Sequence, residues 1–199
     1  MTALATAIGK QLARPTGWRG RLVGAAMRVA NRRATALAID ALAVAPGNAV
    51  LDFGCGAGDA IPCLSRRARD GQIYGIDHSA DMIAAAARRH AHATFHCASF
   101  TALPLPAASV DRVLATNVAY FWYDDGAVLD EIRRVLRPGG RLSVYVTAAS
   151  ALRRAGLGNS GTHRLFDRYD LARILGPRAK VENVDAGFGV AGLIGTLWL

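Results

Sequence analysis

The sequence predicts an α/β protein built on a doubly wound, mostly parallel seven-stranded sheet with an antiparallel last strand and an N-terminal helical lid. Short apolar runs alternate with amphipathic segments of helical period, a pattern typical of such sheets. The apolar run 49–53 passes directly into three alternating glycines and then a helix. The connection 187–192 is too short for a crossover, so the last two strands should be antiparallel neighbours.

The length and composition indicate one compact unit. The chain has 199 residues and is 52% hydrophobic and 20% charged, which argues against disorder. We predict a helical lid over residues 1–45 and an α/β domain over residues 46–199. An odd number of cysteines without metal or disulfide spacing favours a reducing compartment, and no apolar run suggests a signal peptide or membrane span. We therefore expect a cytoplasmic protein.

A formal net charge of +9 leaves two explanations open. One is a compositional bias towards arginine. The other is an anionic partner such as nucleic acid, a lipid surface or an acidic substrate. Seven basic residues lie between Lys10 and Arg33, and no acid precedes Asp40. This arm could lie on a membrane or grip phosphates, or it could form a lid with a solvated arginine face.

The glycine loop that follows the first strand is the strongest functional signal. Gly54, Gly56 and Gly58 let the backbone turn sharply and bring its N–H groups close to a ligand, beside the start of a helix. A dinucleotide fingerprint would place its last glycine at position 59, where this chain has Asp59. The loop thus predicts a nucleotide-shaped site and disfavours a dinucleotide.

A second anchor follows about 20 residues after the loop. The helix predicted over 58–69 tolerates Pro62 near its first turn. The strand over 72–77 ends in Asp77, whose carboxylate can accept two hydrogen bonds from a ribose diol. Ser79 is a suitable N-cap for a helix through His90.

The rest of the chain completes the alternation of strands and helices. Further strands are predicted over 94–99, 110–117, 141–147, 180–187 and 193–199, and further helices run from Asp124 or Asp125 to Leu136 and over 167–176. Pro138-Gly139-Gly140 is expected to stop a helix, and 148–166 to be a long functional connection. Four consecutive aromatics, Tyr120 to Tyr123, follow the fourth strand, where they could contact a substrate or pack against the lid.

Several stretches resemble class I S-adenosylmethionine (SAM)-dependent methyltransferases in order and spacing. They are VLDFGCGAG (50–58), GIDHSADMI (75–83), LPLPAASVDRVLATNVAYFW (103–122) and EIRRVLRPGGRL (131–142). The lead-in over 11–33 is similar to that of a bacterial small-molecule branch. The resemblance implies a Rossmann-like methyltransferase fold with SAM as its cofactor.

The resemblance also implies a set of cofactor-binding residues: Asp52, Gly54, Cys55, Gly56, Gly58, Asp77, His78, Ser99, Phe100 and Asn117. Asp52 would support the loop and the methionine amine of SAM, the glycine loop would let SAM approach the backbone, and Asn117 would lie near the methionine. Asp77 would hold the ribose, with His78 beside the adenosine. Ser99 replaces an aspartate that usually contacts the adenine, and the backbone of Phe100 is the alternative contact.

The implied reaction is in-line displacement of the sulfonium methyl by an oxygen, nitrogen or carbon nucleophile of a small molecule, with no metal. A base is needed only if the acceptor must lose a proton, and His163 and Tyr120 are the catalytic candidates by position. Tyr120 and Phe121 stand where the family often has a histidine pair, so the substrate class stays open. His90, His92 and His96 lack metal-ligand spacing and are interpreted as structural or solvated.

Two other functions remain open. One is a SAM-binding module without methyl transfer, and the other is an NAD(P)-binding oxidoreductase. The expected partner is a small-molecule substrate, with anionic compounds among the candidates; nucleic acid and a membrane surface are alternatives. The chain is expected to be a monomer or a homodimer.

Overall fold

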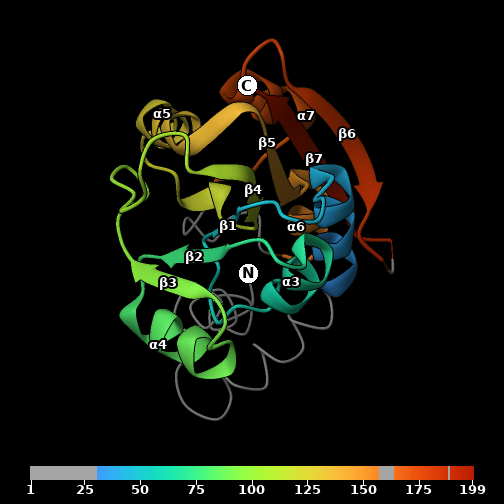
Figure 1. Ribbon diagram of the computed structural model, residues 1–199. Helices are drawn as coiled ribbons and strands as arrows, with labels where there is room; N and C mark the ends of the chain where they lie inside the picture. Colours follow the sequence, from blue (N-terminus) through green and yellow to red (C-terminus); the bar gives the residue numbers. More distant parts are fainter. Residues whose placement is uncertain (1–30, 157–163, 188) are drawn as a thin grey trace.

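Seven strands form one sheet in the computed structural model, which describes residues 31–156, 164–187 and 189–199 (Figure 1). The strands are β1 (Val50–Phe53), β2 (Ile73–Asp77), β3 (Thr94–Cys97), β4 (Val110–Thr116), β5 (Leu136–Thr147), β6 (Lys180–Asp185) and β7 (Ala191–Trp198). Their order is β3-β2-β1-β4-β5-β7-β6. Neighbours from β3 to β5 pair in parallel, and β7 pairs antiparallel with both β5 and β6. The predicted doubly wound sheet with an antiparallel last strand is confirmed.

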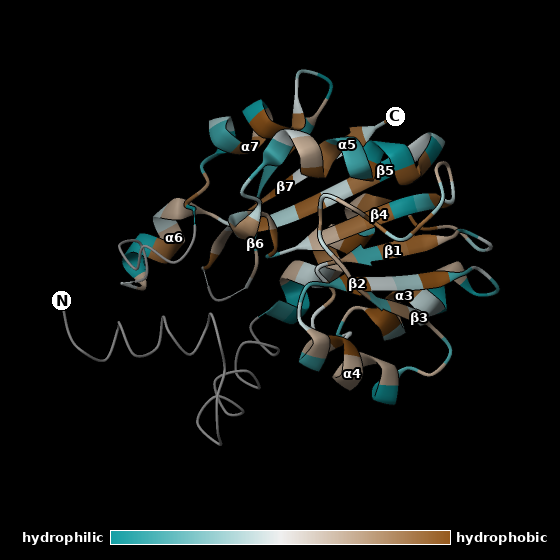
Figure 2. Ribbon diagram, turned by 90° about the vertical axis from the view of Figure 1, so that its left-hand side faces the viewer, coloured by the Kyte–Doolittle hydropathy of each residue, from teal (hydrophilic) through white to brown (hydrophobic). Residues whose placement is uncertain are grey.

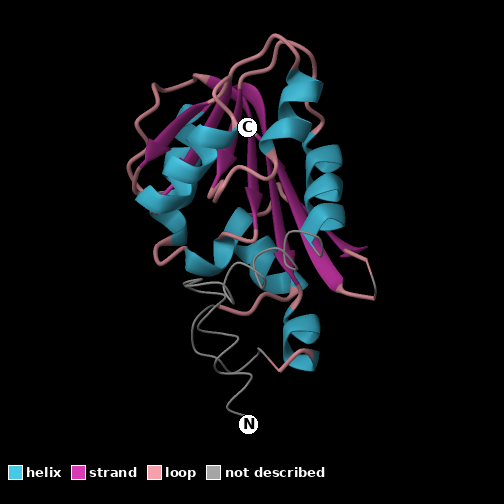
Figure 3. Ribbon diagram, turned by 90° about the horizontal axis from the view of Figure 1, so that it is seen from below, coloured by secondary structure: helices cyan, strands magenta, loops and turns pink. Residues whose placement is uncertain are grey.

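Helices cover both sides of this sheet (Figure 3). They are a helix that includes residues 31–42, α3 (Ile61–Ala68), α4 (Ala80–Arg89), α5 (Asp125–Val135), α6 (Ala149–Arg154) and α7 (Arg168–Leu175), with a 3₁₀ turn η1 (Ala119–Phe121) after β4. Hydrophilic and hydrophobic residues share α5 and α7, as amphipathic helices that cover a sheet require (Figure 2).

The alternation of side chains along the strands divides the core into two layers. In β1, Leu51 and Phe53 pack with the α5 and α7 side, whereas Val50 packs with α3 and the helix over 31–42. The same alternation in β4 separates Leu114 from its neighbours. A sheet buried on both faces in this way has its ligand-binding positions at the strand ends, where the loops emerge.

The predicted helix caps that flank the site are confirmed. The Ser79 side chain accepts a hydrogen bond from Met82 N–H at the start of α4. Of the two candidates for α5, Asp124 is the cap, because its carboxylate accepts Ala127 N–H at 3.0 Å. Pro62 lies in the first turn of α3, where its missing N–H leaves no bond unmade.

The structure differs from the prediction at Pro138-Gly139-Gly140. We expected a helix stop and turn before a strand from Arg141, but β5 begins at Leu136, which pairs with Val110. The end of the chain holds this segment in the strand, because Gly139 N–H donates to Leu199 O at 2.7 Å and Leu199 N–H donates to Gly140 O at 3.1 Å. α5 ends at Val135, close to the predicted Leu136, and Gly139 keeps a positive φ of 78° within an irregular stretch of pairing. Only the start of the strand therefore differs from the prediction.

Two other segments bear on the predicted lid and connection. Residues 1–30 of the lid lie outside the described residues; the helix over 31–42 buries Ala38, Ile39 and Leu42, and Ser143 Oγ donates to Ala38 O at 2.9 Å. The predicted connection 148–166 contains α6, and its residues 157–163 are not among those described. The lid therefore stays a prediction, and its last helix is part of the α/β core.

Candidate functional site

The glycine loop connects the carboxyl end of β1 to α3 and is hydrogen-bonded to β2. Gly54 N–H and Cys55 N–H both donate to Ile76 O, at 2.8 and 3.0 Å. Gly54, Gly56 and Gly58 all have positive φ angles, of 75°, 52° and 79°. This backbone conformation favours glycine, so the alternating glycines reflect the path of the loop itself.

The three glycines serve different purposes. A Cβ at Gly54 would lie 2.4 Å from Val118 Cγ2, and one at Gly58 would lie 2.8 Å from His90 Cδ2. At Gly56, by contrast, a Cβ would meet nothing within 4 Å. Gly54 and Gly58 are therefore needed for packing within the protein, and Gly56 is the glycine that leaves open space over the loop.

Asp77, at the carboxyl end of β2, ties the glycine loop to the start of α4. One carboxylate oxygen accepts Gly56 N–H at 2.9 Å, and the other accepts Ser79 N–H at 2.9 Å. The residue is buried, and His78 Nδ1 lies 3.5 Å from the second oxygen. Each carboxylate oxygen has two lone pairs and uses one of them for its backbone hydrogen bond, so that one remains for a further donor. Asp77 is thus fixed beside the loop with acceptor capacity for a ligand.

Asp52 is an acid buried in the middle of the sheet. Its exposed fraction is 1%, and among the described residues its Oδ2 has no hydrogen-bond partner. Burial, followed by the nearby carboxylates of Asp77 and Asp59, raises the pKa of Asp52 to about 7. A buried acceptor without a donor is uncommon, and a donor or cation from a ligand would satisfy it.

Ser99 and Phe100 follow β3 and lie on the His78 side of the loop. The Phe100 ring packs 4.5 Å from Phe53 and 5.9 Å from His78, centroid to centroid. Ser99 is exposed, and its hydroxyl accepts Thr101 N–H at 3.2 Å within a local turn. The structure brings Phe100 and His78 together, while Ser99 faces solvent.

Cys55 directs its side chain away from the open loop surface. It is buried, and a Cβ at Gly75 of β2 would lie 3.0 Å from its Sγ. Burial and the carboxylates of Asp52 and Asp77 raise the pKa of the thiol. Only the backbone of Cys55 is therefore suited to a ligand contact. All three cysteines of the chain are free thiols.

Asn117 and Tyr120 form a hydrogen-bonded group at the carboxyl end of β4. Asn117 has a positive φ of 54°, a conformation often found where backbone strain serves a site. The Tyr120 hydroxyl donates to Asn117 Oδ1 at 3.1 Å and accepts Thr147 N–H from the end of β5. Burial raises the pKa of Tyr120, so its phenol stays protonated at neutral pH. This state favours a hydrogen-bonding role over that of a base. His163 lies outside the described residues.

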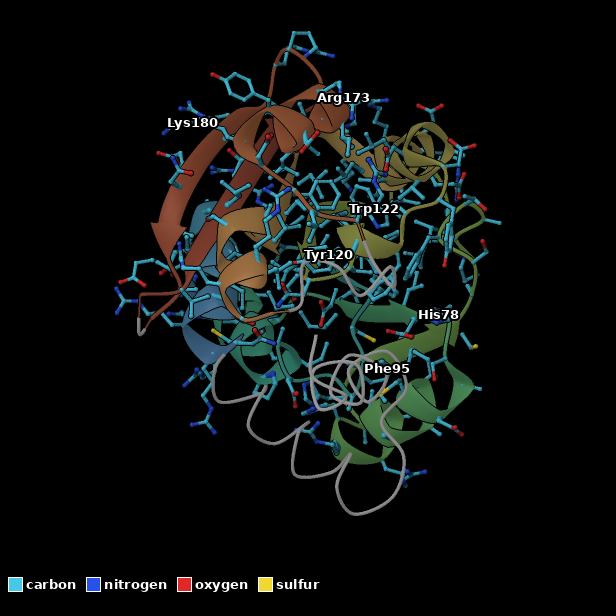
Figure 4. All side chains as sticks on the ribbon, turned by 180° about the vertical axis from the view of Figure 1, so that it is seen from behind. His78, Phe95, Tyr120, Trp122, Arg173 and Lys180 are labelled. Carbon is cyan, nitrogen blue, oxygen red and sulfur yellow. The ribbon has the colours of Figure 1, made fainter. Side chains whose placement is uncertain are left out.

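The aromatics after β4 separate in space. Trp122 is buried with its ring edge-on to Phe53 at 6.1 Å, whereas Tyr123 is fully exposed. Tyr120 packs 5.9 Å from Phe166. Figure 4 shows Tyr120 and Trp122 centrally and His78 towards the β2–β3 side. Burial of Trp122 supports a packing role for that residue, and substrate contact by the other aromatics stays a prediction.

Residues far apart in the sequence complete the surroundings of the site. Arg164 donates to both carboxylate oxygens of Asp125, at 2.7 and 2.8 Å, and to Trp122 O at 3.2 Å. Arg89 donates to Ala57 O in the glycine loop. Sequence reasoning missed both arginines, because no local motif connects residues about 30 to 40 positions apart.

The described part of the chain offers neither a metal cluster nor a membrane span. No group of three or more His, Cys, Asp or Glu side chains there is placed to hold a metal ion. Within the same residues, no helix combines the length and apolar character needed to cross a membrane.

Comparisons with known proteins agree on one family. A family model described as a methyltransferase domain matches residues 51–144. The chain is 35% identical over 153 residues to a malonyl-[acyl-carrier protein] O-methyltransferase of Methylovorus sp., covering 69% of this chain and 51% of that protein. It is 30% identical over 132 residues to the uncharacterized methyltransferase YdaC of Bacillus subtilis, covering 65% of this chain and 73% of that protein.

A solved structure extends the likeness to nearly the whole chain. The crystal structure of a SAM-dependent methyltransferase from Aquifex aeolicus superimposes with a TM-score of 0.69 at 19% identity, covering 96% of this chain and 98% of the other. At that identity the likeness concerns the fold. The chain spans 31% to 51% of the length of several curated relatives that it matches.

Proposed function

Because this chain belongs to the class I SAM-dependent methyltransferase family, we propose that it transfers the methyl group of SAM to an oxygen, nitrogen or carbon nucleophile of a small molecule. SAM is the cofactor, because solved neighbours are described as SAM-dependent or contain S-adenosyl-L-homocysteine. The observation that carries the proposal is the glycine loop, which is bound through Gly56 N–H to the buried carboxylate of Asp77. Loop and carboxylate are the parts that a nucleoside ligand needs.

The residues present fit SAM at three points. The unpartnered Oδ2 of Asp52 suits a cationic donor, which the α-ammonium group of SAM provides. The remaining lone pairs of Asp77 suit the two hydroxyls of a ribose. The open space at Gly56 allows a ligand to approach the backbone. These matches support the proposed cofactor-binding roles of the three residues.

The protein would contribute mainly positioning. Bound SAM supplies a methyl group on a sulfonium, which is already a good leaving group. Residues at the ends of β4 and β5 then have to orient the acceptor and exclude water. The bonds joining Asn117, Tyr120 and Thr147 make this part of the site rigid. The protonated phenol of Tyr120 is suited to orient the methyl acceptor by hydrogen bonding and not to remove a proton from it. An acceptor that loses its proton readily therefore fits this site best.

The proposed role of Asp52 makes SAM affinity depend on pH. Because the pKa of Asp52 is about 7 in the free protein, its carboxyl is mostly protonated below that pH and ionised above it. An ammonium group binds the ionised form, so affinity should rise up to about tenfold per pH unit towards pH 7 and then level off. Isothermal titration between pH 5.5 and 8 measures this rise.

The Asp52→Asn variant should bind SAM more weakly and lose most of the pH dependence. A His78→Gln control should retain it; an unchanged pH profile in Asp52→Asn would contradict the role of Asp52.

The proposed activity is tested by binding and turnover together. Isothermal titration should show binding of SAM and of its demethylated product, and isotopically labelled SAM should label an acceptor in a screen of small metabolites, lipids and RNA. Absence of binding by both compounds would overturn the proposal. Binding of NAD instead would support an oxidoreductase, and SAM binding without any labelled product would support a binding module.

A further inference from the structure

The carboxyl end of α4 contacts the glycine loop, although helix and loop are far apart in the sequence. Arg89 Nη1 donates to Ala57 O at 2.7 Å and to Asp59 Oδ1 at 2.8 Å. The next residue, His90, is buried and packs against Gly58, where a Cβ would lie 2.8 Å from its ring. The last residue of α4 and the C-cap residue that follows it thus contact three consecutive residues of the loop.

The amino end of α4 is joined to the same loop through Asp77. Ser79 N–H, at the cap of α4, donates to one oxygen of that carboxylate, and Gly56 N–H donates to the other. Residues 56–59 are therefore tied at one side to the start of α4 and at the other to its end. The helix fixes the loop relative to the carboxylate proposed to bind the ribose.

Asp59 is the negatively charged residue of the loop that pairs with the end of α4. It occupies the position at which a dinucleotide fingerprint would have its last glycine, and here its carboxylate is the ion-pair partner of Arg89. Both side chains are about half exposed, 46% for Arg89 and 44% for Asp59. An exposed pair of this kind contributes little to folding. Its main effect should therefore be on the shape of the loop.

We propose that Arg89 is a positioning residue for SAM, which holds the loop at Ala57 and Asp59 in the form that binds the cofactor. The inference rests on the proposed function of the site. Without Arg89 the loop would adopt its binding form only part of the time, and the apparent dissociation constant would rise by the inverse of that fraction. If the loop adopts its binding form for about 10–20% of the time, the affinity for SAM is about five- to tenfold weaker.

Arg88 offers a matched control on the same turn of α4. It is exposed and makes no ion pair or hydrogen bond with any residue that the structure describes. Arg89→Ala and Arg88→Ala are compared with the unchanged chain by isothermal titration of SAM at pH 8 and by thermal melting. We expect Arg89→Ala to bind SAM about five- to tenfold more weakly, Arg88→Ala to stay within twofold, and both to melt within about 2 °C of the unchanged chain. Arg89→Lys should recover part of the affinity, because its ammonium can still donate to Ala57 O.

The double mutant separates positioning from a general loss of charge. If the Arg89–Asp59 pair acts through the loop, Asp59→Asn alone should weaken SAM binding a few-fold, and Asp59→Asn with Arg89→Ala should be no weaker than Arg89→Ala alone. If Arg89→Ala melts at a lower temperature than this range, the SAM affinity of the Asp59→Asn variant tests the proposal in its place. Equal affinities of the Arg89→Ala and Arg88→Ala variants, or unchanged affinity of Asp59→Asn, would overturn this inference alone. Failure of the unchanged chain to bind SAM would overturn the proposed function and the inference with it.

Discussion

Replacing Asp77 with alanine is expected to weaken SAM binding about 100-fold. The substitution removes the acceptor proposed for both ribose hydroxyls, and each charge-assisted hydrogen bond contributes about 1.5–3 kcal/mol. Even the low estimate for two such bonds, about 3 kcal/mol, corresponds to about 100-fold in affinity. The change also releases Gly56 N–H and Ser79 N–H, which the carboxylate now binds. Isothermal titration with SAM measures the loss.

Asp81 provides the control for this experiment. It is an exposed acid in the first turn of α4, the helix that begins just after Asp77. It has no hydrogen bond or ion pair with the described residues. Asp81→Ala should leave SAM affinity within twofold. Asp77→Asn keeps a carbonyl acceptor and should lie between the alanine variant and the unchanged chain. A folded Asp77→Ala variant with unaltered affinity would refute the ribose-binding role.

Replacing Gly54 with alanine is expected to destabilise the fold by about 2–4 kcal/mol. The new Cβ would lie 2.4 Å from Val118 Cγ2 and 2.7 Å from Val118 Cβ, so the loop or the β4 end would have to shift. Overpacking against a buried side chain such as Val118 costs about 1–3 kcal/mol, and the positive φ of 75° adds about 1 kcal/mol. For a chain of this length the melting temperature should fall by roughly 5–15 °C. Thermal and urea unfolding measure the loss.

Gly47 separates the collision from the backbone strain. Its φ is 81°, similar to that of Gly54, but a Cβ there would meet nothing within 4 Å. Gly47→Ala should therefore cost only about 1 kcal/mol. Combining Gly54→Ala with Val118→Ala should recover part of the lost stability, because the nearest colliding methyl is gone. Equal destabilisation by Gly47→Ala and Gly54→Ala would show that contact with Val118 is unimportant.

The elements that the sequence predicted well are those whose signals are local. Alternating apolar runs located the strands, and the predicted caps Ser79 and Asp124 located helix starts. The acid at the end of β2 was recognised for the same reason, since its spacing from the glycine loop follows from one strand–helix–strand unit. The predicted end of the helix near Leu136 is confirmed, but the predicted start of the next strand at Arg141 was wrong, because Leu199 supplies hydrogen bonds that no local pattern reveals.

Turn residues, caps and periodicity act over a few positions, and these local signals were enough to predict the fold class, the family resemblance and the two ends of the proposed cofactor site. How the site is held together depends instead on contacts between distant segments. The tertiary structure showed that Gly54 faces Val118, that burial raises the pKa of Asp52 to about 7, and that the end of α4 contacts the glycine loop. It also gave Asp59 a partner in Arg89. Contact, burial and charge pairing depend on which distant segments meet in space, and that is set by packing of the whole chain.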